Sequence, residues 1–197
     1  MTILIASDPA FQFIYRANID ALRQVGSVSF FSPLADSSLP PCDLLYLPGG
    51  YPELFAEGLA ANLSMRQHIR DYAMGGGRIF AECGGFMYLC SDMDGQPMCG
   101  VLPLSVTMRG SRLRLGYRQM EWGGLHLKGH EFHYSSIVDD SKLPSAISVL
   151  RLQSSALGMP VDTPIYQCSR VTAGYTHWYW ADKSPSEILT FMSGNLS

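Results

Sequence analysis

Three short apolar runs limit what this chain can fold into. They are residues 2–6, 43–47 and 78–82, and Gly or Pro follows each of them closely. Runs of this length are too short for buried helices and are typical of strands covered on both faces of a parallel sheet. Helical patterns over residues 13–25 and about 53–73 separate them. This alternation predicts an α/β fold with a doubly wound, mostly parallel sheet.

The second half of the chain has a different pattern. It ends in a predicted helix at residues 185–192, but strands dominate before that. The predicted strands are residues 101–108, 113–122, 148–152 and 165–168. Strands with few helices between them indicate an antiparallel extension of the sheet. A length of 197 residues suits one domain, so we expect a single domain over residues 1–197.

Composition excludes several classes of protein. With 47% hydrophobic and 16% charged residues, the chain is globular. A net charge of −3 with scattered basic residues argues against a nucleic-acid partner. No apolar run approaches the roughly 18 residues of a membrane span, and the N-terminus lacks a signal-peptide pattern. Five cysteines without metal-ligand spacing predict a reduced, cytoplasmic protein with no disulfide and no metal.

Cys83 stands at the most informative position. The strand at residues 78–82 runs directly into Cys83-Gly84-Gly85, and a short apolar helix follows. A nucleophile on such a turn projects into a site at the carboxyl end of the sheet. The helix N-terminus favours a thiolate, and its free N–H groups suit an oxyanion. The alternative is a structural cysteine in a glycine turn, as we expect for the other four cysteines.

A second glycine turn, Gly49-Gly50, follows the strand at residues 43–47. Glycine lets a backbone approach another group closely, so the N–H groups of Gly50 and Gly84 could together form an oxyanion hole. A plain strand-to-helix turn is the simpler interpretation of Gly49-Gly50 alone. The Lys and Ser/Thr of a Walker loop are absent, which argues against a phosphate loop.

A cysteine nucleophile needs a base nearby, and the histidines are the candidates. His68 and His126 are predicted to lie at the surface. His130 and His133 are three residues apart on a predicted strand, so they face opposite sides, which argues against a metal site. His177 lies in an aromatic run, where a packed core histidine is the commoner case. The pattern alone leaves His177 and His133 as alternative bases.

Four motifs in order make the chain recognisable: residues 47–54, 81–89, 129–135 and 175–177. Together they resemble the C-terminal glutaminase domain of the cobyrinic acid a,c-diamide synthases of corrinoid biosynthesis. The resemblance extends from Ile3 to about Trp180. It implies a class I glutamine amidotransferase fold of the flavodoxin-like kind, which cleaves L-glutamine and passes on the ammonia.

The resemblance also implies roles for individual residues. Cys83 would be the nucleophile and His177 the general base. The implied oxyanion-hole and substrate-binding residues are Gly49, Gly50, Gly84, Phe132 and His133. Many class I enzymes have a Glu two residues after the histidine, but Tyr179 stands there in this chain. What orients His177 is therefore left open, with Asp182 as a weak candidate.

The partners follow from the same resemblance. Family enzymes have an N-terminal synthase domain that uses ATP and Mg²⁺, whereas no cofactor is expected in the glutaminase domain. We expect this chain to work with such a synthase domain, covalently or as a separate chain, and a homodimer is compatible with it. One alternative is the glutaminase of a related cobyric acid, sirohydrochlorin or cell-wall precursor synthase. Others are a catalytically silent docking module and a different cysteine enzyme on the same fold.

Overall fold

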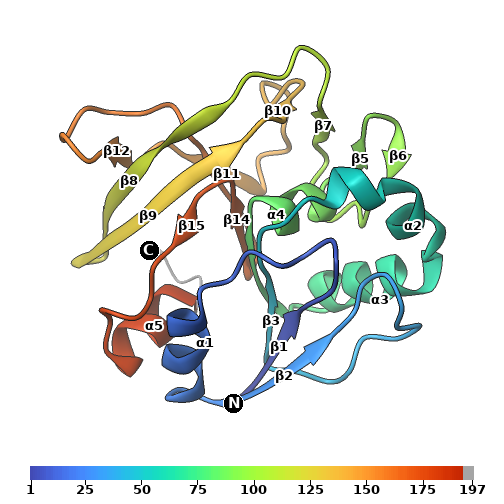
Figure 1. Ribbon diagram of the computed structural model, residues 1–197, viewed down its shortest axis with the longest axis horizontal. Coiled ribbons are helices and arrows are strands. Elements are labelled where there is room, and N and C mark those ends of the chain that lie inside the picture. The colour runs from blue at the N-terminus through green and yellow to red at the C-terminus, as the bar shows by residue number, and fades with distance from the viewer. Residues whose placement is uncertain (193–197) are drawn as a thin grey trace.

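The computed structural model describes residues 1–192 and has a central mixed sheet with helices on both faces (Figure 1). The strand order is β11-β13-β14-β4-β3-β1-β2. The strands are β1 (Thr2–Ala6), β2 (Ser27–Phe31), β3 (Leu44–Leu47), β4 (Arg78–Glu82), β11 (Ile147–Leu150), β13 (Ile165–Cys168) and β14 (Val171–Gly174).

Five of these strands are parallel, in the spatial order β2-β1-β3-β4-β14. This is the flavodoxin-like order, with β14 as the fifth strand. β13 and β11 add an antiparallel edge beside β14. The predicted α/β class, with its mostly parallel sheet and antiparallel extension, is confirmed. Ligands in sheets of this order bind at the carboxyl ends of the strands.

Alternate residues of each strand enter two separate cores. The helices are α1 (Arg16–Arg23), the 3₁₀ helix η1 (Pro52–Phe55), α2 (Ala56–Ala61), α3 (Leu63–Met74), α4 (Gly84–Leu89) and α5 (Pro185–Met192). In β1, Leu4 packs in the core with α3 and α4. Its neighbours Ile3 and Ile5 pack in the core with α1 and α5. Burial on both faces explains why the strands are apolar without interruption.

Two predicted helices differ in the structure. The pattern over residues 53–73 forms η1, α2 and α3 instead of one helix. The break is at Asn62, whose side chain accepts a hydrogen bond from Met65 N at 3.3 Å and so begins α3. The helix predicted over residues 13–25 begins only at Arg16, because Phe13 N donates to the carbonyl of Gly49 at 3.0 Å.

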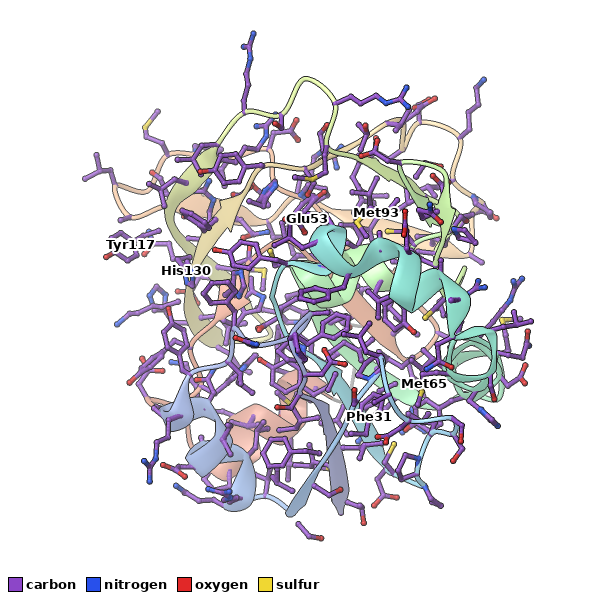
Figure 2. The ribbon with its side chains drawn as sticks, turned by 45° about the vertical axis from the view of Figure 1, so that its right-hand side comes forward. Phe31, Glu53, Met65, Met93, Tyr117 and His130 are labelled. Carbon is purple, nitrogen blue, oxygen red and sulfur yellow. The ribbon has the colours of Figure 1, made fainter. Side chains whose placement is uncertain are left out.

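The remaining strands form two small sheets. One has the order β10-β7-β5-β6 and the other the order β12-β8-β9-β15. Their strands are β5 (Asp92–Met93), β6 (Gln96–Pro97), β7 (Ser105–Thr107), β8 (Arg114–Trp122), β9 (Leu125–His133), β10 (Ser136–Ile137), β12 (Gln153–Ser155) and β15 (His177–Trp178). The strand predicted over residues 101–108 is thus reduced to β7. Tyr117 points outward from the β8–β9 hairpin (Figure 2).

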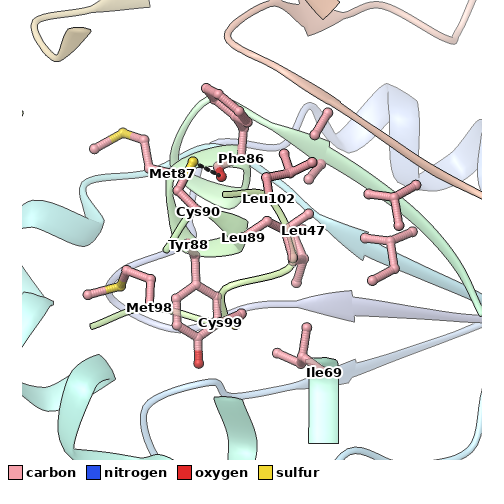
Figure 3. Close-up of a cluster of buried hydrophobic side chains, with 14 of the residues drawn as sticks. Leu47, Ile69, Phe86, Met87, Tyr88, Leu89, Cys90, Met98, Cys99 and Leu102 are labelled. Carbon is pink, nitrogen blue, oxygen red and sulfur yellow. Dashed lines mark hydrogen bonds between the residues drawn. The ribbon is translucent and has the colours of Figure 1, made fainter. Parts of the chain in front are cut away.

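Helix α4, behind the Cys83 turn, is buried throughout. Its residues Phe86, Tyr88 and Leu89 pack beside Leu47 and Leu102 in one cluster (Figure 3). Cys90 is the C-cap residue of this helix, and its thiol donates a hydrogen bond to the Phe86 carbonyl at 3.3 Å. Cys90 and Cys99 are buried core residues, as predicted. A helix fixed on all sides holds the turn before it in one position.

Within residues 1–192, no helix is both long enough and apolar enough to span a membrane.

Candidate active site

Cys83 has a strained backbone. Its φ of 45° and ψ of −105° lie in a region that non-glycine residues rarely adopt. Cys83 N donates to the Gly174 carbonyl of the neighbouring strand at 2.8 Å. The next two residues have no room for side chains: a Cβ would lie 2.1 Å from Leu47 O at Gly85 and 2.9 Å from Gly50 N at Gly84. Close packing of β3, β4 and α4 therefore forces the sharp turn.

The glycine turn after β3 lies beside the Cys83 turn, because β3 and β4 are neighbours in register. Gly50 N adjoins Gly84. A Cβ at Gly50 would lie 1.9 Å from the carbonyl oxygen of Ala10. A Cβ at Gly49 would lie 2.1 Å from Cε1 of His177. Gly49 thus makes room for the imidazole, a role that its sequence position did not reveal.

His177 reaches the site from β15, just after the end of β14. Its backbone pairs with His130 of β9, and the two rings stack with centroids 4.6 Å apart. The Phe13 and His177 rings meet edge to face, with their centroids 6.3 Å apart. Burial, with the nearby His130 and His133, lowers the pKa of His177 to about 3. The imidazole is therefore neutral near pH 7, the form that can accept a proton.

One cavity of about 250 Å³ contains both Cys83 and His177. The other lining residues are Phe13, Gly50, Tyr51, His130 and Phe132. The Cys83 thiol donates to the Phe132 carbonyl at 3.7 Å, a sulfur contact within the cavity. Of the residues predicted for the site, five thus meet here: Cys83, His177, Gly50, Phe132 and, behind Gly50, Gly84.

The Cys83 thiol is protonated at rest, contrary to the expectation of a favoured thiolate. Burial is the main cause and the charge of Glu53 the second, and they raise its pKa to about 12. The Gly84 N–H lowers the pKa, as a helix N-terminus should, but by less than burial raises it. Nucleophilic attack therefore requires a base that removes the thiol proton.

His133 is placed beside the cavity but its ring nitrogens are occupied. Nδ1 is 2.8 Å from Ser135 O, and Nε2 is 2.7 Å from a carboxylate oxygen of Glu131. The His133 ring also stacks on the Tyr175 ring, with the two centroids 3.6 Å apart. His133 has no free nitrogen to accept the proton of Cys83. Between the two bases that the sequence leaves open, the geometry favours His177.

Glu131 is a buried carboxylate that sequence reasoning did not assign. It accepts hydrogen bonds from His133, from Arg118 Nε at 2.7 Å and from the Thr163 hydroxyl at 2.8 Å. Burial alone would raise its pKa, but these hydrogen bonds and the Arg118 charge lower it to about 2. Glu131 thereby fixes His133 at the cavity wall. No set of three His, Cys, Asp or Glu side chains within residues 1–192 is placed to hold a metal ion.

The carboxylate that approaches the His177 segment is Glu82, which precedes the nucleophile. One oxygen accepts the N–H of Trp178 at 2.8 Å and the other accepts the Tyr46 hydroxyl at 2.7 Å. Burial raises the pKa of Glu82 to about 8. Glu82 and His177 also line a second cavity of about 240 Å³. The sequence feature that could have indicated Glu82 is its position as the charged last residue of a strand whose three central residues are apolar.

Tyr179, at the position of the usual Glu, and Asp182, the weak candidate for orienting His177, both make their contacts elsewhere. Tyr179 is 38% exposed and packs its ring edge against Tyr15, at 5.8 Å. Asp182 pairs with Lys183 at 3.3 Å and approaches Lys128 at 4.0 Å. The Asp182 suggestion was therefore wrong. Packing against His130, Phe13 and Gly49 fixes the imidazole in its place, together with the hydrogen bond that the adjacent Trp178 N–H donates to the Glu82 side chain.

The strand order and the cysteine turn after β4 define a glutamine amidotransferase-like fold, and solved structures agree. A structure titled glutamine amidotransferase superposes with a TM-score of 0.64 over 98% of both chains, at 20% identity. A second, a glutamine amidotransferase from Thermotoga maritima, gives a TM-score of 0.56 at 15% identity, over 89% of this chain and 75% of that one. At these identities the likeness concerns the fold.

Within this class, the chain belongs to the family of CobB/CobQ-like glutamine amidotransferase domains, whose model matches residues 2–185. It is 38% identical to the cobyrinate a,c-diamide synthase of Methanothermobacter thermautotrophicus, over 89% of this chain and 44% of that protein. It is 37% identical to the hydrogenobyrinate a,c-diamide synthase of Pseudomonas aeruginosa, over 89% of this chain and 40% of that protein. The chain thus spans less than half of these relatives.

Proposed function

We propose that this chain is the glutaminase part of a cobyrinate or hydrogenobyrinate a,c-diamide synthase and hydrolyses L-glutamine through Cys83 and His177. The observation that carries the proposal is the single cavity shared by a thiol at a strained turn and a neutral imidazole. Family membership supports glutamine as the amide that enters this cavity.

The proposed reaction has two halves, formation of a thioester and its hydrolysis, and His177 takes up and returns one proton in each. His177 takes the thiol proton as Cys83 Sγ attacks the side-chain amide carbon, and the Gly50 and Gly84 N–H groups stabilise the oxyanion. The C–N bond then breaks, and His177 returns the proton to the leaving ammonia. Water, deprotonated by His177, hydrolyses the thioester to glutamate and restores the thiol. Phe132 and His133 form the wall against bound glutamine, and Gly49 leaves space for the imidazole.

The relatives' names point to the use of the ammonia, namely amidation of the a and c carboxylates of a corrin precursor. The part of those enzymes that this chain does not match would bind ATP and Mg²⁺ and activate the carboxylates. We therefore propose residues 1–197 as one glutaminase domain without a cofactor of its own. Its partner is the synthase domain.

The test is covalent labelling with 6-diazo-5-oxo-norleucine, a glutamine mimic that alkylates the nucleophile. We expect one adduct in the intact mass, located on Cys83 by peptide mapping and prevented by excess glutamine. Half-buried Cys42 is the internal control and should stay unmodified.

A Cys83→Ala variant should take no label. Labelling of wild type that glutamine does not prevent, or a label on another cysteine, would contradict the proposal. A folded protein that takes no label, with or without its synthase half, would indicate a silent docking module instead.

A further inference from the structure

Glu53 is a charged residue beside the active site that the mechanism above does not use. It lies on η1, three residues after Gly50, and is half-buried. Figure 2 labels it at the start of the η1–α2 segment. Among the described residues, no Lys, Arg or His forms an ion pair with it, although burial of its carboxylate disfavours the charge and raises its pKa.

The Glu53 side chain lines a recess of the Cys83 cavity. The recess measures about 20 Å³, and its wall includes Cys83, Phe132 and Tyr134. This is room for one group the size of a water molecule or an ammonium. The recess shares Gly50, Cys83 and Phe132 with the main cavity, so one extended molecule can occupy both.

An unpaired carboxylate at this place hinders the reaction unless something neutralises it. The charge of Glu53 is the second-largest cause, after burial, of the raised pKa of the Cys83 thiol. A cation in the recess would give Glu53 a partner and would remove this obstacle to thiolate formation. The recess therefore suits a small cation that arrives with the substrate.

We infer that Glu53 binds the α-ammonium group of the substrate, so that the site accepts a free α-amino acid amide and its nucleophile becomes reactive when that group is bound. The inference rests on the proposed function, because it concerns the same cavity. Four single bonds separate the amide carbon of glutamine from its α-nitrogen, a reach of about 5 Å when extended. The amide can thus contact Cys83 while the ammonium enters the adjoining recess.

The experiment compares L-glutamine with glutaramate, the same amide without the α-amine, on the 197-residue chain. Protection of Cys83 against iodoacetamide gives the affinity for each amide, and ammonia release gives kcat/KM. Wild type should prefer glutamine by about 10- to 100-fold, as for hydrogen bonds to a charged group. Glu53→Gln should reduce the preference towards one by weakening the affinity for glutamine while leaving the affinity for glutaramate unchanged. The kcat/KM for glutaramate should rise, because the charge that hinders formation of the Cys83 thiolate is gone. The matched control, Glu57→Gln, alters an exposed carboxylate of α2 and should change neither value.

Two results with the Glu53→Gln variant would overturn the inference alone, as would one result with wild type. One is a Glu53→Gln protein that keeps the full preference for glutamine. The other is a variant in which both amides weaken by the same factor, which would mean that Glu53 acts on Cys83 or on the fold. If glutamine protects Cys83 in neither protein, the inference and the proposed function both fail. If glutaramate protects wild type as well as glutamine does, the amide site stands but the ammonium subsite does not.

Discussion

At the scale of single residues, the site depends on missing side chains as much as on those present. Gly49 is the clearest case, because the imidazole of His177 occupies the space that a side chain there would need. Glu82, by contrast, contributes a side chain. It accepts the N–H of Trp178 and so holds the backbone after His177 to β4, the strand that precedes Cys83. The candidate base is thus positioned by packing and by the hydrogen bond from the Trp178 N–H to Glu82, and within residues 1–192 no side-chain acid bonds to its ring.

Gly49→Ala should therefore impair activity more than stability. The new methyl group would lie 2.1 Å from His177 Cε1, so the ring must shift. We expect glutaminase kcat to fall by about 100-fold, as a misplacement of about 1 Å can cause, while the midpoint of urea unfolding changes little. The matched control is Gly58→Ala in α2, whose nearest neighbour would be the flexible Leu34 Cδ2 at 3.2 Å. Equal activity of the two variants would show that Gly49 does not set the position of His177.

At the scale of elements, Asn62 decides where helices begin and end. Its side-chain oxygen caps α3, while its Nδ2 donates to the carbonyls of Pro33 and Asp36 at 2.8 and 2.9 Å. The residue therefore ties the η1–α2–α3 segment to the loop after β2. The helical pattern continues through it, since the hydrophobic stripe resumes in α3 with Met65 and Ile69 buried.

Asn62→Ala should destabilise the protein by about 1–3 kcal/mol, through loss of the cap and of two bonds to loop carbonyls. Ser64→Ala is the control in the same helix and loses a single bond, to Ser37 O. Its cost should be about 1 kcal/mol. Urea unfolding measures both, and the labelling of Cys83 should be unchanged in each. Equal costs for the two variants would contradict a special role of Asn62 in ending one helix and starting the next.

At the scale of the whole molecule, three buried groups with large pKa shifts contribute most to the dependence of stability on pH below pH 8. Glu82 has a pKa of about 8 when folded, against an ordinary 4.5, so the folded state holds a proton that the unfolded state has lost. His177, at about 3 against 6.5, and Glu131, at about 2 against 4.5, behave oppositely. Their unfolded forms bind protons that the folded forms do not.

Because these pKa shifts have opposite directions, the free energy of unfolding should be constant over a middle range of pH and should decline on each side of it. Between pH 4.5 and 6.5 the effects of Glu82 and His177 cancel. Above pH 6.5 only Glu82 acts, and the free energy of unfolding falls by about 2 kcal/mol up to pH 8. Below pH 4.5 both His177 and Glu131 lower it. Urea unfolding at about pH 3.5, 5.5, 7 and 8 measures the plateau and both declines.

Two variants assign the two limbs of that curve. Glu82→Gln should remove the decline above pH 6.5, and Glu131→Gln should weaken the acid limb while leaving the alkaline one intact. An alkaline limb that persists in Glu82→Gln would mean that another group causes it.

The sequence by itself determined the features that depend on near neighbours. Short apolar runs indicated the parallel strands, and Cys83 with its two glycines indicated the turn, because strand length, turn chemistry and helix entry are local properties. The four ordered motifs indicated the family. Among the site residues, local pattern isolated Cys83 but left His177 and His133 as alternatives.

Only the tertiary structure decided the rest, because it depends on contacts between residues far apart in the chain. The register of β9 with β15 stacks His130 on His177. Arg118 of β8 and Thr163 bond to Glu131 and hold it where it occupies Nε2 of His133. Burial raises the pKa of Cys83 above what its helix position alone suggests. No local pattern encodes how deeply a group is buried or which distant carboxylate faces it, so these properties emerge only when the strand ends meet.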